Sequence, residues 1–345
     1  MFKSIGILRN DHLGDLILTI PLVLAVKRIF PHSNISLIVS PAQKDISLIL
    51  DLDVKWLLLD RKLPLTHIIE ALKKEHLDTI LEVYPNFKMS LCSYLARIPM
   101  RVGYAYKPSG IFANKKVYVH RSRPLIHESS FALEFLKRIK PESFLDVNTL
   151  KHEIPLCIEE DLKLEAKKLL KEQGLIKKDK NIVAIHPGFG GSALNWPIKR
   201  YAELITDLST NPHISLVLTG SLKEKDVLTK IRSEARLKLP LICGLKLSLF
   251  AAVLTYFQIF IAPSTGVLHL ADILGIRTIG IYSPLKAHSP KKWGPLKNST
   301  ILIPKVPCKT ANQKMRSIPQ KQRDNIMANL SALEVVSTVL KLINT

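Results

Sequence analysis

The sequence predicts an α/β protein built from two doubly wound parallel sheets. Short apolar stretches without polar alternation recur along the chain, and helical patterns separate them. Such stretches are typical of parallel strands that helices cover on both faces. The alternation breaks near residues 140–158 and restarts after a charged helix that Gly174 ends. At 345 residues, the chain also exceeds what one hydrophobic core usually serves. Two domains are therefore expected.

The elements follow in order. In the first half, strands are expected over 4–9, 35–40, 54–60 and 78–83, with helices over 15–30, 41–52 and 64–77. In the second half, the expected strands are 181–188, 214–220, 258–264 and 277–284, and the expected helices are 159–174, 197–209, 223–235, 266–275 and 331–343. This pattern predicts domains over 1–155 and 156–328, followed by a C-terminal helix within 329–345.

Charge and cysteine content narrow the class of protein. Fifty Lys and Arg residues against 29 Asp and Glu residues give a formal charge of +21, which favours anionic partners such as nucleic acid, anionic lipid or phosphorylated substrates. A lysine-rich surface without a specific partner explains the same number. The four cysteines form no CxxC pair, which fits a reducing compartment. The first strand begins too early for a signal peptide, so a cytoplasmic location is expected.

The first candidate site is the stretch ILRNDHLGDLILTIP, where a strand, a polar turn and an apolar helix follow one another. Asp15 lies in the first turn of that helix. A carboxylate there is explained as a partner of the helix dipole. Asn10 or Asp11 could cap the helix equally well, however, which leaves Asp15 free to act in an active site.

Three loops in the second half are also candidates, because each follows a predicted strand. HPGFGGSALNWP brings Gly190, Gly191 and Ser192 before a helix, and APSTGVLHL brings Ser264, Thr265 and Gly266 onto a helix N-terminus. Backbone N–H groups in such turns bind phosphate, although a glycine turn can also serve packing alone. His269 lies one helical turn after Thr265, where a packed histidine is the ordinary explanation. Glu224 could accept hydrogen bonds from ribose hydroxyls or be an ordinary first-turn residue.

Other chemistry finds little support in the sequence. The DLD at Asp51–Asp53 is best explained as a solvated turn, no metal-ligand spacing occurs among the histidines and cysteines, and no G-x-S-x-G is present. No metal site is expected. The basic segment 305–323 contains two prolines and is expected as a loop, either binding anions or simply solvated.

Together, these segments resemble glycosyltransferase family 9, the heptosyltransferases of lipopolysaccharide core synthesis. GDLILTIPLVLAVKRIFP resembles the N-terminal strand, turn and helix of that family, HPGFGGSALNWPIKRYAEL its donor-phosphate segment, and STGVLHLADILGIRTIGIYSP its D-T-G-x-x-H-L stretch. The resemblance implies a GT-B fold, in which two Rossmann-like domains face each other across a cleft. It assigns acceptor binding to the N-terminal domain and nucleotide-sugar binding to the C-terminal domain.

The resemblance also implies a function and a set of residues. The enzyme is expected to transfer a sugar, most simply heptose from ADP-heptose, with inversion, to a lipopolysaccharide core or related envelope glycan. Asp15 is the expected general base, and no cofactor or metal is expected. The expected partners are a nucleotide-sugar donor, a phosphorylated or lipid-linked acceptor and an anionic membrane surface at the inner face of the cytoplasmic membrane. The residues expected to bind the donor are Gly190, Gly191, Ser192, Lys199, Glu224, Ser264, Thr265, Gly266 and His269.

Two departures from the family pattern keep alternatives open. Leu194 stands where the family often has Lys, and Ser264 stands where an acid opens D-T-G. Lys199 and the basic segment 305–323 are the candidates for the missing positive charge. A family member with another nucleotide-sugar or acceptor is therefore the main alternative. A basic nucleic-acid-binding protein is a distant one, because zinc-finger spacing and aromatic recognition motifs are absent. A nicotinamide-dependent oxidoreductase is equally distant, since one glycine replaces the three of the dinucleotide fingerprint.

Overall fold

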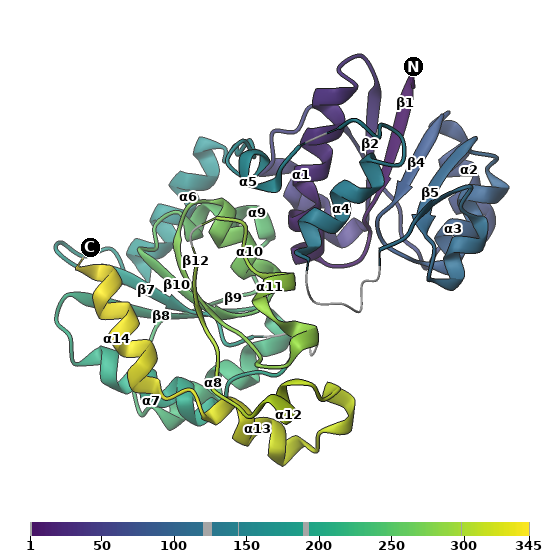
Figure 1. Cartoon of the computed structure of the whole chain (residues 1–345). Coiled ribbons are helices and arrows are strands. Elements are labelled where there is room, and N and C mark those ends of the chain that lie inside the picture. The colour runs from purple at the N-terminus through teal and green to yellow at the C-terminus, as the bar shows by residue number, and fades with distance from the viewer. Residues whose placement is uncertain (1, 120–125, 144, 189–192, 298, 345) are drawn as a thin grey trace. The chain divides into compact units, whose positions relative to one another are not determined.

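A computed structural model describes residues 2–119, 126–143, 145–188, 193–297 and 299–344 (Figure 1). The chain divides into two compact units, Met1–Cys157 and Ile158–Thr345. Each unit contains one parallel six-stranded sheet with flanking helices. The predicted fold class, two Rossmann-like doubly wound domains of the GT-B type, is confirmed.

The sheet of the first unit has the order β3-β2-β1-β4-β5-β6. Its strands are β1 (Ser4–Leu8), β2 (Asn34–Val39), β3 (Lys55–Leu58), β4 (Thr79–Glu82), β5 (Met100–Tyr104) and β6 (Lys115–Val117). Leu8 is in register with Ile38 on one side and with Glu82 on the other. The direction of winding therefore reverses between β1 and β4, and the loops that follow these two strands mark the ligand-binding edge of such a sheet.

Helices cover both faces of this sheet. They are α1 (Leu13–Ile29), α2 (Leu65–Lys74), α3 (Phe87–Leu95), α4 (Glu128–Leu136) and α5 (Val147–Leu150), with the 3-10 helices η1 (Pro41–Leu48) and η2 (Pro108–Phe112). In Figure 1, α1 and α4 lie together on one face, and α2 and α3 lie on the other. Helix α1 is apolar on all sides and buries eleven of its 17 residues, as expected for a helix enclosed by neighbours.

The sheet of the second unit has the order β12-β11-β10-β7-β8-β9. Its strands are β7 (Asn181–Ile185), β8 (Ile214–Gly220), β9 (Leu241–Cys243), β10 (Ile259–Pro263), β11 (Arg277–Ile281) and β12 (Ser299–Leu302). Its helices are α6 (Glu160–Glu172), α7 (Ile198–Ser209), α8 (Lys225–Glu234), α9 (Leu247–Leu254), α10 (Gly266–Ile273), α11 (Pro290–Trp293), α12 (Cys308–Ala311), α13 (Gln320–Ala328) and α14 (Ala332–Ile343), with the 3-10 helices η3 (Leu222–Glu224), η4 (Lys286–His288) and η5 (Met315–Ser317). Here the winding reverses between β7 and β10.

The structure corrects several of the predicted elements. Each sheet has six strands where four were expected, because β6 and β9 have only three residues each, and β5, β6 and β12 carry polar or basic residues. Residues 41–48 form a 3-10 helix rather than an α-helix. The segment 305–323 is not a plain loop, since it contains α12, η5 and the first turn of α13.

Within the described part of the chain, no single helix is long and apolar enough to cross a membrane. Helices α13 and α14, bent by 44° at their junction, meet the length and composition requirement only as a pair. Their apolar residues belong to the core of the second unit, where Met327, Val335 and Val339 are fully buried. Packing in the core of the second unit therefore explains the apolar residues of both helices.

A buried acid lies at the end of the central strand β4. Glu82 is 2% exposed, and its Oε2 accepts a hydrogen bond from the Ser90 hydroxyl. Its Oε1 has no hydrogen-bond partner among the described residues. Burial raises the pKa of the Glu82 carboxyl to about 7, although the hydroxyls of Ser90 and Ser93 and the charge of Arg101 favour the ionised form.

This raised pKa makes the stability of the first unit depend on pH. Both states are protonated below the ordinary pKa of 4.5, and the folded state then holds its proton up to about pH 7, so stability falls as pH rises between these values. The loss is at most about 3 kcal/mol. We expect Glu82→Gln, which stays neutral, to raise the thermal midpoint at pH 8 and to have little effect near pH 4.5. The exposed control Glu70→Gln should show no such trend, and an equal gain at both pH values would contradict this account.

Candidate active site

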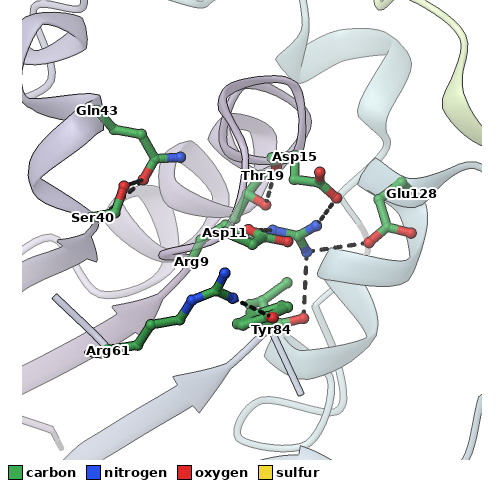
Figure 2. Close-up of polar contacts among 10 residues, drawn as sticks. Arg9, Asp11, Asp15, Thr19, Ser40, Gln43, Arg61, Tyr84 and Glu128 are labelled. Carbon is green, nitrogen blue, oxygen red and sulfur yellow. Dashed lines mark hydrogen bonds and ion pairs between the residues drawn. The ribbon is translucent and has the colours of Figure 1, made fainter. Parts of the chain in front are cut away.

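One buried arginine organises the C-terminal edge of the first sheet. Arg9 directly follows β1 and has no exposed surface. Figure 2 shows its guanidinium between three carboxylates that come from different parts of the unit: Asp11 from the turn after β1, Asp15 from the first turn of α1, and Glu128 from the start of α4. A charge this deeply buried requires such partners.

The contacts use every nitrogen of the guanidinium. Arg9 Nε lies 2.9 Å from Asp11 Oδ1, Nη1 lies 3.2 Å from Glu128 Oε1, and Nη2 is ion-paired with Asp15 Oδ1. Nη1 also donates a hydrogen bond to the Val83 carbonyl, 3.4 Å away, just after β4. The planar, five-donor arginine fork suits this arrangement, which a lysine ammonium could not reproduce. The end of β1 is thereby joined to α1, α4 and β4.

The electrostatics of the cluster follow from its composition. Burial alone would lower the pKa of Arg9, but Asp11, Asp15 and Glu128 together raise it above its ordinary value. Burial raises the pKa of Asp11, against the opposing effect of Arg9. One cation therefore faces three acids, so the cluster is rich in acceptor oxygens and can accommodate a proton.

Asp15 is the member of the cluster that solvent reaches. Its side chain is 17% exposed, against 6% for Asp11 and 1% for Glu128. Within the described residues, its contact with Arg9 uses Oδ1, and no contact engages Oδ2. Asp15 therefore combines a fixed orientation with a free, accessible oxygen.

The alternative capping residues do not cap α1. The N-cap is His12, which makes no side-chain capping bond, while Asn10 donates to the Leu59 carbonyl and Asp11 pairs with Arg9. Asp15 still lies in the first turn of α1, where the helix dipole favours a negative charge. Asp15 therefore interacts favourably with the dipole of α1 and is also ion-paired with Arg9.

A second cation lies at the same edge, after β3. Arg61 donates to the Tyr84 hydroxyl over 2.7 Å, and its guanidinium lies 5.7 Å from the centre of that ring. Figure 2 shows this pair beside the Arg9 cluster. Among the described residues, Arg61 has no carboxylate partner, so it can bind a negatively charged group.

In the second unit, predicted residues gather where β7 and β10 end. Thr265 is the N-cap of α10, and its hydroxyl donates to the Pro263 carbonyl, 3.2 Å away, rather than capping the helix. No side chain in the described residues caps α10, so the backbone N–H groups of Gly266 and Val267 face the edge of the sheet without such a partner. Ser264 lies beside the buried Tyr282, which follows the neighbouring strand β11: burial raises the pKa of Tyr282, and Ser264 opposes that rise. A helix start of this kind can hold an anion.

Glu224 reaches the same edge from the loop after β8. Its Oε2 accepts hydrogen bonds from the backbone and the hydroxyl of Ser221, both over 2.7 Å, in a capping box. Its Oε1 presses against Gly188, just after β7, since a Cβ built on that glycine would lie only 2.1 Å away. The carboxylate thus caps a helix and also lies beside the β7 loop. Burial lowers the pKa of the nearby His186 to about 4, against the opposing effect of Glu224.

The remaining predicted residues have different positions. Gly190, Gly191 and Ser192 lie outside the described residues. His269 is 4% exposed in α10, one turn after Thr265. Lys199 is exposed in the first turn of α7 and lines a pocket with residues of α7, α8 and α14, and no described contact joins it to another predicted donor-binding residue. Leu194 is buried in the core of the second unit, which explains why an apolar residue suits that position.

Arg9, Asp11 and Glu128 are the residues of the candidate site that sequence reasoning missed. A charged residue directly after an apolar strand is a usable signal for Arg9, and Asp11 belongs to the same polar turn. Glu128 lies 119 positions from Arg9, and nothing in its local sequence marks it. Among the described residues, no group of three or more His, Cys, Asp or Glu side chains is placed to hold a metal ion.

Solved structures resemble the whole chain. A glycosyl transferase family 9 protein from Veillonella parvula matches with a TM-score of 0.81 and 17% identity, covering 99% of this chain and 97% of its own. The E. coli heptosyltransferase WaaC, solved with ADP, matches with a TM-score of 0.69 and 16% identity, covering 98% of this chain and 99% of its own. At these identities the likeness establishes the GT-B fold.

Sequence comparison extends the likeness to function. The lipopolysaccharide core heptosyltransferase OpsX of Haemophilus influenzae is 21% identical over 306 residues, which are 86% of this chain and 82% of that protein. The sequence profile of glycosyltransferase family 9 (heptosyltransferase) matches residues 65–322. Because that match spans well over half of the chain, the protein belongs to glycosyltransferase family 9.

Proposed function

We propose that this enzyme transfers heptose from ADP-heptose to a phosphorylated or lipid-linked glycan of the lipopolysaccharide core, with Asp15 as the general base. The observation that carries the proposal is the state of Asp15, whose Oδ1 is held by buried Arg9 while Oδ2 remains accessible. The names of the relatives support the sugar and the acceptor class, and the bound ADP of the E. coli enzyme supports the nucleotide.

In the proposed step, an acceptor hydroxyl attacks the anomeric carbon of the donor sugar as Asp15 Oδ2 takes its proton. The bond between that carbon and the diphosphate oxygen breaks, its electron pair leaves with ADP, and the configuration inverts. General-base catalysis of this kind contributes about 10²–10⁴-fold in rate. Arg9 is a positioning residue, because it fixes the carboxylate without contacting the substrates.

The leaving diphosphate gains negative charge, which fixed N–H groups can stabilise. Ser264, Thr265 and Gly266 supply a helix start for this purpose, with Gly190, Gly191 and Ser192 as the proposed second contact. Glu224 is the proposed acceptor for the ribose hydroxyls. Because backbone groups carry the charge, the proposed transfer needs no metal or other cofactor. Arg61 is placed to bind an acceptor phosphate.

The main alternative is a family member with another donor. Leu194 is 4% exposed in the core, so the cation that often stands there in relatives is missing, and Lys199 lies in a different pocket.

Binding of nucleotides to the purified protein tests the donor directly. We expect ADP to bind at least tenfold more tightly than GDP, UDP or CDP in calorimetry, with ADP-heptose binding at least as tightly as ADP. Tighter binding of another nucleotide would change the proposed donor but would leave the proposed role of Asp15 unchanged. Absence of binding to all four would contradict the assignment of the second unit as the donor site.

The role of Asp15 predicts a specific pattern of loss. Asp15→Asn should lower kcat by about 10²–10⁴-fold, because the amide cannot take the proton, while the affinity for ADP stays within about twofold. Asp53→Asn is the control, since that side chain is fully exposed in the same unit. Activity close to wild type in Asp15→Asn would place the base elsewhere, and an equal loss of ADP binding would indicate a structural role.

A comparison of two ligands separates the proposed ribose contact of Glu224 from its role as a helix cap. Wild-type protein should bind ADP about 10–100-fold more tightly than 2′,3′-dideoxy-ADP, because hydrogen bonds to a charged group are worth about 1.5–3 kcal/mol. Glu224→Ala should abolish that preference. Glu334→Ala removes a matched capping box with Ser331 at the start of α14 and should leave the preference unchanged. A preserved preference in Glu224→Ala would refute the ribose contact.

A further inference from the structure

An exposed apolar face lies on the first unit, on the side of the sheet that α2 and α3 cover (Figure 1). It is formed by one side of α3 together with η2, and we call it the α3–η2 face. Its members are Phe87, Leu91, Tyr94, Leu95, Ile111 and Phe112. Phe87, Tyr94 and Leu95 recur at the spacing of one helix side, and each is more than 40% exposed. Ile111, at 76%, is the most exposed large apolar residue of the chain's described part.

Tertiary contacts hold the α3–η2 face in a defined conformation. Phe112 packs between the rings of Phe87 and Tyr94, with ring centres 5.1 and 5.8 Å away. Gly110 lies so close to β5 that a Cβ there would meet the Tyr104 carbonyl at 2.1 Å. This contact holds η2 against the sheet and leaves the Ile111 side chain on the outside. Scattered exposed apolar residues are ordinary, whereas a continuous aromatic and aliphatic face marks a contact surface.

The chain segment that forms this face carries charge of one sign. Residues 83–119 contain six basic residues and no acidic residue, in a stretch that supplies α3, β5, η2 and β6. Arg97, Lys107, Lys115 and Lys116 are exposed and make no ion pair with a described residue. Arg101 lies 5.3 Å from the centre of the Tyr94 ring, at the base of the face. The segment that forms the apolar face thus carries basic side chains and no acidic ones.

We infer that the α3–η2 face docks this enzyme on an anionic lipid bilayer, with its apolar side chains in the headgroup region and the surrounding Lys and Arg residues against lipid phosphates. Aromatic and aliphatic side chains on one side of a short helix, flanked by basic residues, are the features of a surface that lies in a membrane interface. Tyr94 and Phe87 suit the depth at which aromatic rings gather. The inference concerns this surface alone and does not depend on the donor or the sugar.

Vesicle co-sedimentation tests the inference with the full chain. Wild-type protein should bind vesicles of phosphatidylcholine with phosphatidylglycerol and should not bind phosphatidylcholine alone, and 0.5 M NaCl should weaken the binding because salt screens the lysines. Ile111→Asp should lower binding at least tenfold. The control Leu333→Asp changes a similarly exposed residue of α14 and should bind like wild type.

A second pair of variants separates this surface from the general positive charge of the chain. Lys115→Gln/Lys116→Gln should lower binding roughly thirtyfold, at about fivefold for each lysine near the membrane. Lys177→Gln/Lys178→Gln removes the same charge from an exposed site of the second unit and should change binding little. Thermal midpoints within a few degrees of wild type would confirm that all variants are folded.

Three results would overturn the inference. Equal binding to neutral and anionic vesicles would exclude a contribution from the charge of the lipids. Equal losses of vesicle binding in Lys115→Gln/Lys116→Gln and Lys177→Gln/Lys178→Gln would show that net charge alone drives binding. A wild-type dimer in light scattering that Ile111→Asp converts to a monomer, without a change in vesicle binding, would identify the face as a contact between two copies of the chain. None of these results depends on catalysis, so the proposed transfer would stand or fall separately.

Discussion

The first unit depends on the burial of one arginine. Arg9 has no exposed surface, and its charge is tolerated only because carboxylates from the β1 turn, α1 and α4 surround it. Removing a partner of a buried charge typically costs about 3–5 kcal/mol, which is a large part of the stability of a domain. The same contacts that hold these elements together also orient Asp15. The stability of the first unit and its proposed catalytic role therefore rest on the same group.

The two units place their candidate residues by the same topological rule. In each sheet the winding reverses at the central pair of strands, β1 and β4 in one and β7 and β10 in the other. Arg9 follows β1 and the Val83 carbonyl follows β4, while Gly188 follows β7 and Thr265 follows β10. The residues differ in chemistry, since one edge holds charged side chains and the other offers backbone N–H groups. That difference is consistent with the proposed division between proton transfer and diphosphate binding.

Sequence reasoning predicted the fold class and most of the long elements, because parallel strands and amphipathic helices have strong local patterns. It failed for β6 and β9, which have three residues each and acquire their conformation from neighbouring strands. Asp15, Thr265 and Glu224 were identifiable because they directly follow strands or open helices. Glu128 was not, because only the packing of α4 against α1 brings it to Arg9. The stacking around Phe112 likewise joins α3 and η2 through tertiary contacts that no periodicity reveals.

The shared cation has a consequence for how this site can change during evolution. Asp11, Asp15 and Glu128 are bound to the same guanidinium, so replacing any one of them alters the environment of the other two. Substitutions within such a network do not combine additively. A relative that loses Glu128 would be under pressure to change Arg9 or Asp11 as well. The four positions should therefore covary as a group, and a drift in one of them would reveal a descendant that has taken up a different base.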